Sequence, residues 1–228
     1  MALPVRLRDV SRGTWLLAAA HLVFTAVLLY QHALGWHWDF LVYSMNAEYL
    51  FHNGAFMEWA RPPIVPLLIG VLRFALPGGA AEYGFILASS AVFLYAVHRF
   101  AASVDVDRLV LYTLLVTPGM VAAATRAGTE LLSLAFLLLF LADRDRGRGG
   151  VWLGLAALTR YTNALLLPLV LVQPRRARLR SAGWAVLPAV PWLAYTWAVT
   201  GDALTSPVSF AALNVVLRQE TAAAGTAA

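Results

Sequence analysis

The sequence contains no cysteine and no lysine, and it carries little charge of either sign. Without cysteine there is neither a disulfide nor a thiolate metal site, so the redox compartment stays undetermined. Only 13% of the 228 residues are charged, whereas 61% are hydrophobic and the mean hydropathy is +0.70. A soluble domain of this length cannot bury so much apolar surface, which excludes an ordinary globular protein.

Common nucleotide and metal motifs are also missing. The sequence has no P-loop, no GxGxxG and no serine nucleophile elbow, and its five histidines lack metal-ligand spacing. The net charge of +5 comes from 17 arginines, which fall in short clusters between apolar runs. This distribution indicates membrane topology and not an electrostatic surface for nucleic acid, so we expect no nucleic-acid partner.

Long apolar runs are frequent instead. They cover residues 14–34, 63–77, 80–101, 107–124, 129–142, 150–173 and 181–200. The first has about the 20 residues of a membrane span. More such segments follow it, so we interpret it as an uncleaved helix and not as a signal peptide. The composition and these runs predict an all-α membrane protein that is surrounded by membrane lipids.

The arginine clusters constrain how the chain crosses the membrane. They precede the first run and occupy three connections: Arg6, Arg8 and Arg12; Arg99 and Arg108; Arg144, Arg146 and Arg148; Arg175, Arg176, Arg178 and Arg180. The positive-inside rule places all of them in the cytoplasm. This holds only if 63–77 lies at the outer interface or is re-entrant. It also requires 150–173 to break at the polar residues 160–163.

The resulting prediction is about seven transmembrane helices plus one or two interfacial helices in a first outer loop, 35–79. Residues 1–210 form a single polytopic membrane domain, and 211–228 are expected to be a disordered tail. The protein is expected in the cell membrane as a multi-pass protein with a cytoplasmic N-terminus.

The same topology divides the acidic residues between the two sides. Four lie inside among arginines: Asp105, Asp107, Asp143 and Asp145. Five lie outside or at the outer boundary: Asp39, Glu48, Glu58, Glu130 and Asp202. A site is expected among the second set, and it would face outside.

One face of the first outer loop has the residues of a general base. If 39–52 is helical, Asp39, Tyr43 and Asn46 share a face at i, i+4 and i+7. Asp39 then lies in the first turn, where the helix dipole favours an ionised carboxylate that can take a proton from an attacking group. His52 could join it. The alternative is that Asp39 only caps an interfacial helix.

Two arginines and one further acid complete the candidate set. Arg61 suits a lipid phosphate, because its fork pairs with phosphate oxygens, although a snorkelling interfacial arginine is the commoner case. Glu130 at the outer end of a helix is either functional or a dipole partner. Arg160 should lie deeper, so it needs a carboxylate or a phosphate as its partner.

Four motifs occur in order between residues 14 and 207. They are Asp39-x3-Tyr43 with Gly54 and Arg61-Pro62-Pro63, then Thr129-Glu130 after Pro118, then Gly154 to Thr159-Arg160-Tyr161, and finally Pro191-Trp192 with Gly201-Asp202. This pattern resembles the membrane module of the GT-C superfamily of glycosyltransferases, which includes aminoarabinose transferases and protein O-mannosyltransferases.

The resemblance implies a polyprenyl-phosphate-linked sugar donor and transfer with inversion on the outer face of the membrane. By position, Asp39 would be the general base and Glu130 would support the acceptor, the base or a cation. Arg61 and Arg160 would hold the donor phosphate, with Tyr43, Asn46, Glu58 and His52 in support. The resemblance leaves open a divalent cation as cofactor.

The sequence departs from the family in two places. Ala60 stands where aminoarabinose transferases have an acid, and the nearest acid is Glu58, so a metal ligand there is in doubt. Family members usually continue well beyond the seventh helix, whereas this sequence ends at 228. A second hypothesis is therefore a non-catalytic subunit that binds a lipid-linked sugar or assists a larger membrane partner. A third hypothesis is a small transporter. It is the least favoured, because few ionisable residues lie within the spans.

Overall fold

A computed structural model describes residues 12–35 and 38–226 of the chain. Within these residues the structure is helical and contains no strand. The elements are α1 (Arg12–Leu34), α2 (Trp38–Phe51), α3 (Ile64–Arg73), α4 (Ala80–Val104), α5 (Arg108–Leu115), α6 (Pro118–Ala127), α7 (Glu130–Ala142), η2 (Gly147–Gly149), α8 (Gly150–Thr159), η3 (Tyr161–Val172), α9 (Arg175–Val186), α10 (Ala189–Thr200) and α11 (Thr205–Thr226).

Two of the described helices, α1 and α4, are long and apolar enough to cross a membrane. They contain 23 and 25 residues, so each is about 35 Å long at 1.5 Å per residue. This exceeds the hydrocarbon core of a bilayer, about 30 Å. Large apolar side chains stand exposed along α1, among them Trp15, Leu22, Val23 and Tyr30. An exposed apolar face of this kind marks an interaction site, and here it indicates membrane association.

Polar side chains join α1, α4 and α5 inside the bundle. His21 is within hydrogen-bonding distance of the Tyr112 hydroxyl, at 3.2 Å, and of the Ser90 hydroxyl, at 3.1 Å. Ser90 also bonds Thr25 at 2.5 Å. Phe24 packs nearby in the same core. Hydrogen bonds between apolar helices fix their relative position in a membrane-like environment.

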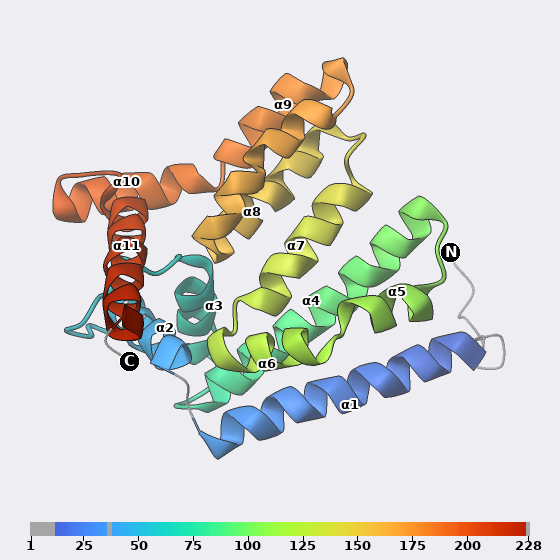
Figure 1. The fold of residues 1–228 in the computed structure, drawn as a ribbon, viewed down its shortest axis with the longest axis horizontal. Helices are drawn as coiled ribbons and strands as arrows, with labels where there is room; N and C mark the ends of the chain where they lie inside the picture. Colours follow the sequence, from blue (N-terminus) through green and yellow to red (C-terminus); the bar gives the residue numbers. More distant parts are fainter. Residues whose placement is uncertain (1–11, 36–37, 227–228) are drawn as a thin grey trace.

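The helices run back and forth between two ends of the molecule (Figure 1). Segments α1, α4, α5 with α6, α7, α8, η3 and α9 alternate in direction, and α4 packs extensively on α7. One end, here called the arginine end, holds the connections at 99–108, 143–149 and 173–180. There Arg99 of α4 bonds Asp143 at the end of α7, at 3.0 Å. The opposite end holds the 35–79 loop. The arginine clusters at 99–108, 143–149 and 173–180 therefore share one end, whereas Arg6 and Arg8 lie outside the described residues.

Close packing of α8 on α9 depends on two glycines four residues apart. A side chain on Gly150 would collide with the carbonyl of Ser181, and one on Gly154 with the carbonyl of Ala185. The G-x-x-x-G spacing lets helix backbones approach closely in membranes. Because the two contacts advance together along both helices, α8 and α9 run parallel, with η3 as the returning segment.

The predicted break in 150–173 is present, but two other runs are not single helices. Arg160 adopts an extended conformation, φ −152° and ψ 110°, between α8 and η3. The expected span 107–124 divides into α5 and α6, because Pro118 starts a new helix that Thr117 caps at Met120 N–H, 3.1 Å. The expected span 181–200 divides at Pro188 into α9 and α10, which lie at an angle (Figure 1).

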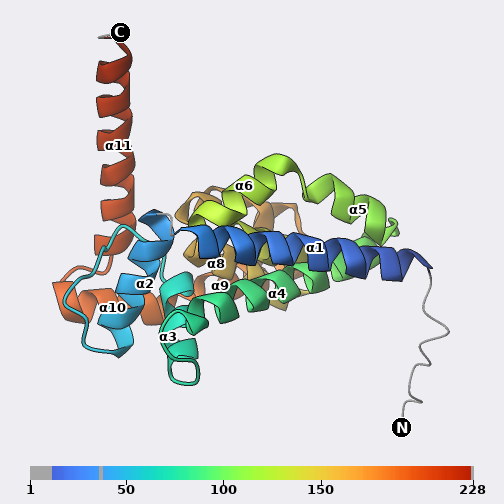
Figure 2. The same cartoon turned by 90° about the horizontal axis from the view of Figure 1, so that it is seen from below.

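The loop 35–79 contains two helices, α2 and α3, which pack against each other. At the other end of the chain, helix α11 covers Thr205–Thr226 and so includes most of the predicted tail 211–228. Its alanine-rich end favours the helix. Helix α11 projects away from the bundle (Figure 2). Residues 227–228 of the predicted tail lie outside the described part.

Candidate functional site

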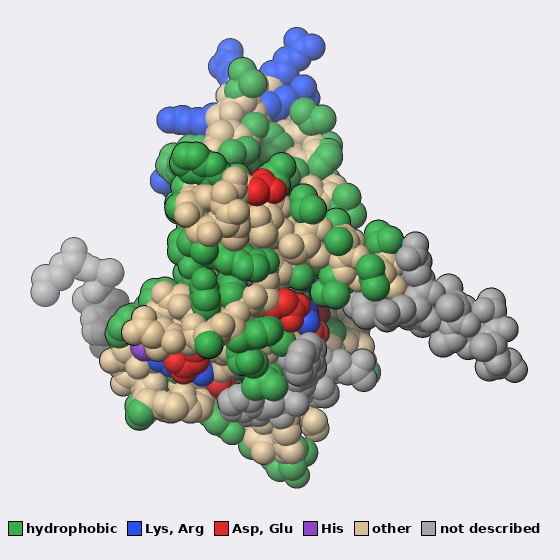
Figure 3. Space-filling model, turned by 90° about the vertical axis from the view of Figure 1, so that its left-hand side faces the viewer, with side chains coloured by type: hydrophobic (Ala, Val, Ile, Leu, Met, Phe, Trp, Pro, Cys, Tyr) green, Lys and Arg blue, Asp and Glu red, His purple; other side chains and the backbone are tan. Residues whose placement is uncertain are grey.

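A cavity of about 320 Å³ opens where the 35–79 loop meets the ends of α7 and α8. It brings together Asp39, Arg61, Glu130 and Arg160, which come from four separate segments of the chain. The remaining lining residues are Tyr43, Ala60, Pro62, Thr129, Tyr161, Thr162, Phe210, Leu213 and Asn214. In Figure 3, acidic and basic side chains lie together in the lower half of the molecule, away from the arginine-rich upper end.

One ion pair of the cavity joins α2 to the loop that follows it. Asp39 is in the first turn of α2, and its Oδ1 lies 2.7 Å from a terminal nitrogen of Arg61. Tyr43, one turn later, is buried, and its ring centroid lies 5.8 Å from the Arg61 guanidinium carbon. Burial raises the pKa of the Tyr43 hydroxyl above its ordinary value, so the phenol stays neutral.

Arg61 faces a second carboxylate as well. Its Nε lies 3.0 Å from Glu58 Oε1. The two groups form an ion pair, but their geometry does not meet the criteria for a hydrogen bond. Burial alone would lower the pKa of Arg61, but Asp39 and Glu58 outweigh this effect and raise it. The guanidinium is therefore held as a permanent cation at the cavity wall.

The second ion pair joins the start of α7 to the break after α8. Arg160 lies 2.8 Å from Glu130 Oε1, and the Thr129 hydroxyl donates to Glu130 Oε2 at 3.1 Å. Gly128, at φ +68°, turns the chain into α7 beside the ring of Phe40, where a side chain would not fit. The two partners differ in exposure, at 45% for the Arg160 side chain and 13% for Glu130. Arg160 is thus the partner more accessible to a ligand.

A chain of hydrogen bonds fixes the far wall of the cavity. Ser206 of α11 donates to the carbonyl of Trp59 at 2.6 Å, and it therefore accepts from the Tyr161 hydroxyl at 2.5 Å. Tyr161 in turn accepts from the Trp192 indole at 3.2 Å. This chain ties the loop, η3, α10 and α11 together, so elements that are distant in sequence form one wall.

Three of the predicted supporting residues lie outside the cavity lining. Asn46 is fully buried, and its amide exchanges two hydrogen bonds with the backbone of Glu58, at 2.9 and 3.0 Å. It clamps the loop that carries Arg61 and does not face the cavity. Glu58 acts through Arg61. His52 packs beside Phe51 and Phe74, with ring centroids 6.5 and 5.2 Å away.

A buried ionic group lies behind α2, and sequence reasoning did not identify it. Glu82 of α4 is 0% exposed and accepts from Ser44 at 2.5 Å, while Arg73 lies 3.3 Å away and His32 3.2 Å away. Arg73 also pairs with Glu48. We call His32, Ser44, Glu48, Arg73 and Glu82 the Glu82 cluster. An acid in the first turn of an otherwise apolar helix is the signal that could have revealed it.

A second cavity, of about 390 Å³, is apolar, and some of its lining residues are neighbours in sequence of those that line the first cavity. Its lining includes Pro63, which follows Pro62 of the polar cavity, and Leu158, two residues before Arg160. It also includes Trp192, whose indole bonds Tyr161. The two cavities are therefore built from neighbouring parts of the same segments, one polar and one apolar.

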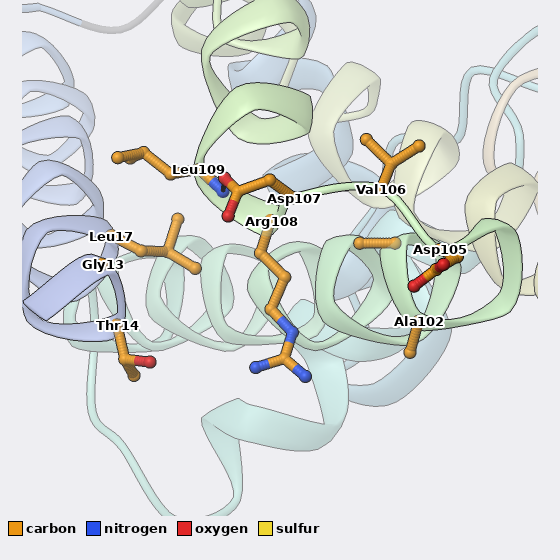
Figure 4. A pocket seen from close by; sticks show the side chains of 10 residues that line it. Gly13, Thr14, Leu17, Ala102, Asp105, Val106, Asp107, Arg108 and Leu109 are labelled. Carbon is orange, nitrogen blue, oxygen red and sulfur yellow. Dashed lines mark hydrogen bonds between the residues drawn. The ribbon is translucent and has the colours of Figure 1, made fainter. Parts of the chain in front are cut away.

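The arginine end also has a pocket, of about 300 Å³, between α1, α4 and α5. Figure 4 shows Arg108 extending into it, with Asp105 and Asp107 on its rim. Asp107 already caps α5, because its carboxylate accepts from the backbone N–H of Leu109 at 2.9 Å. These residues come from one short connection and do not form a convergent set like that of the first cavity.

Within residues 12–35 and 38–226, no group of three or more His, Asp or Glu residues could hold a metal ion. We therefore assign no metal ligand in the cavity. Comparison of this chain with protein-family models, with curated proteins and with solved structures finds no match. The functional argument consequently depends on the geometry of the cavity.

Proposed function

We propose that the chain is a membrane glycosyltransferase that uses a polyprenyl-phosphate-linked sugar and transfers the sugar with inversion. One observation carries the proposal: the Asp39–Arg61 and Glu130–Arg160 ion pairs meet in one cavity. The two guanidinium cations can bind the phosphate of the donor, and a carboxylate beside them can accept the proton of the acceptor group. This combination is what the departure of a phosphate-linked sugar requires.

The donor phosphate would bind to the two guanidinium groups. Arg160 is the more exposed of the two, and each guanidinium can pair bidentately with phosphate oxygens. A phosphate there competes with Asp39 and Glu130 for their arginine partners. Binding of the donor would thereby release Asp39 as a proton acceptor.

The reaction exchanges one bond to the anomeric carbon for another. An acceptor oxygen or nitrogen attacks this carbon from the face opposite the phosphate, and Asp39 takes the proton of the attacking group. The bond from the anomeric carbon to the phosphate oxygen breaks, and polyprenyl phosphate leaves with the electron pair. Arg61 and Arg160 stabilise the charge on the leaving phosphate. Attack from the opposite face gives inversion.

The apolar cavity suits the lipid part of this donor. It adjoins the phosphate-binding residues through Pro62–Pro63 and through Leu158 before Arg160. A polyprenyl chain buried there would contribute about 0.8 kcal/mol for each buried methylene-sized group. The phosphate would then lie at the boundary between the two cavities.

In the membrane arrangement that we propose, the back-and-forth segments make seven crossings and α2 and α3 lie at the outer interface. The arginine end is cytoplasmic, in keeping with the positive-inside rule, and the cavity faces outside. Segments shorter than the bilayer core, such as α7 and α8, rely on the longer α1 and α4 and on local thinning.

A second candidate is a non-catalytic subunit that binds the same donor for a larger membrane partner. Helix α11 favours it, because α11 lines the cavity with Phe210, Leu213 and Asn214 and projects from the bundle. Its exposed Val215 and Val216 offer an apolar surface to a partner. Donor binding without transfer by the chain alone, together with co-purification of a larger membrane protein, would favour this candidate.

Sugar transfer in membranes by the Asp39→Asn variant tests the proposal. Loss of the base should lower transfer by about 100-fold or more, while donor binding is retained. The control is Asp202→Asn, which removes an exposed carboxylate outside the cavity lining and should leave transfer unchanged. Unchanged transfer by Asp39→Asn would show that Asp39 is not the base.

A further inference from the structure

We propose that the arginine end carries a binding surface for anionic phospholipid headgroups. The surface consists of five arginines, here called the arginine patch: Arg144, Arg148, Arg175, Arg176 and Arg180. The inference rests on the membrane placement proposed above and not on sugar transfer.

The arginines of the arginine patch form no ion pair with an acidic side chain in the described part of the chain. All five side chains are exposed, and none has an ion-pair partner among the described residues. The nearby Arg146 and Arg99 instead share Asp143. Figure 3 shows basic side chains crowded together at the upper end of the molecule. Unpaired like charges at this density repel one another, so a bound anion would stabilise them.

Packing brings the two halves of the patch together. Gly147, in the loop with Arg144 and Arg148, lies so close to Arg180 that a Cβ on Gly147 would be 2.6 Å from Arg180 Cδ. Helix α9 also packs on η2. The patch is therefore one surface formed by two connections, and it can contact an anion from two sides.

The start of α9 adds a second reason to expect an anion. Arg175, Arg176 and Arg178 occupy its first turns, and no acidic residue is in the first turn. The helix dipole places partial positive charge at the same point, so cations there are unfavourable for the helix. A phosphate at this end would compensate both the dipole and the side chains.

Apolar side chains beside the patch identify a lipid as the occupant. Leu179 lies between Arg178 and Arg180 and is 88% exposed, and Leu171 and Val172 are also exposed. A soluble polyanion leaves such side chains in water, whereas a phospholipid covers them with acyl chains while its phosphate meets the arginines. The headgroup class is anionic, as in phosphatidylglycerol.

The test is native mass spectrometry of the full chain in detergent, titrated with dioleoyl phosphatidylglycerol or with dioleoyl phosphatidylcholine. Each basic residue near an anionic membrane surface contributes about fivefold in affinity. We expect tighter binding of phosphatidylglycerol, by at least about tenfold. The triple variant Arg175→Gln, Arg176→Gln, Arg180→Gln should lose this preference. Arg108→Gln removes an arginine flanked by Asp105 and Asp107 and should keep it.

A lysine triple variant at the same positions keeps the charge and should keep most of the preference. It separates loss of charge from loss of folding if the glutamine variant unfolds. Equal affinity for the two lipids, or an unchanged preference in the glutamine variant, would overturn the proposal. So would a single-stranded oligonucleotide that binds to the patch as tightly as phosphatidylglycerol at the same ionic strength.

Discussion

The cavity and the Glu82 cluster use the same kinds of side chains, but the cluster is built around a fully buried acid. In the cavity, the side chains of Asp39 and Arg160 are 39% and 45% exposed. In the cluster, Glu82 is fully buried and is contacted from α1, α2 and α3 by His32, Ser44 and Arg73. Both groups hold acids and arginines in pairs, but both cavity pairs line an open cavity, whereas the carboxylate at the centre of the cluster is closed to a ligand.

This difference separates a structural from a functional use of charge. A buried carboxylate without partners would be strongly unfavourable, so the Glu82 cluster holds α2, α3 and α4 in one arrangement. Ser44 of this cluster lies on α2, directly after Tyr43 and two residues before Asn46. The cluster consequently fixes the helix that presents Asp39 to the cavity. The cavity pairs are weaker and open, as a binding site requires.

The largest loss of stability is expected from Glu82→Ala. Removing the acid takes the buried carboxylate away from the Arg73 guanidinium and the His32 ring, which should lower the free energy of unfolding by about 3–5 kcal/mol. Denaturant unfolding in detergent micelles measures it. Glu82→Gln keeps the acceptor for Ser44 and should lose less. A change below about 1 kcal/mol in Glu82→Ala would mean that the cluster does not hold these helices.

A smaller loss is expected from Asn46→Ala. The backbone N–H of Glu58 loses its acceptor, while the Glu58 carbonyl keeps the Arg61 N–H at 3.2 Å, so we expect a loss of about 1–3 kcal/mol by the same measurement. Asn214→Ala is the matched control, because its amide makes an exposed bond to the Phe210 carbonyl. It should stay within about 0.5 kcal/mol of the wild type. Equal losses in the two variants would contradict the assignment of Asn46 as a clamp.

The smallest loss is expected from Arg160→Gln. In its ion pair with Glu130 the Arg160 side chain is exposed, and ion pairs of this kind contribute about 1 kcal/mol or less to stability. Unfolding should therefore be nearly unchanged, even though a ligand contact is lost. A loss comparable to that of Glu82→Ala would place Arg160 with the structural charges and not with the site.

Much of the helical pattern could be predicted from composition and charge. The break at Arg160 followed from a polar run inside an apolar segment, and α1 and α4 followed from length. The breaks at Pro118 and Pro188 were missed, although proline interrupts a helix for a local reason. Both runs were long enough for one span, and length alone does not separate a straight helix from a broken one.

Helical spacing and charge predicted part of the candidate site. Asp39 and Tyr43 share a face and both line the cavity, but Asn46 on the same predicted face turns to its own loop. The position of Glu82 in the first turn of an apolar helix marks it as a candidate, but its contacts span up to 50 residues in sequence, so the sequence does not identify its partners. Phe210 and Leu213 of α11 line the cavity for the same reason, because only packing brings that helix there.

The most direct test of the donor site is the affinity of the full chain for a short-chain polyprenyl phosphate, measured by titration calorimetry in detergent. The variant Arg61→Gln, Arg160→Gln should bind at least about 100-fold more weakly than wild type, because it loses two charged hydrogen bonds that contribute about 1.5–3 kcal/mol each. Arg108→Gln should bind like wild type, and the unphosphorylated polyprenol should not distinguish the variants. Equal phosphate affinity in wild type and the double variant would contradict the assignment of this cavity as the donor site.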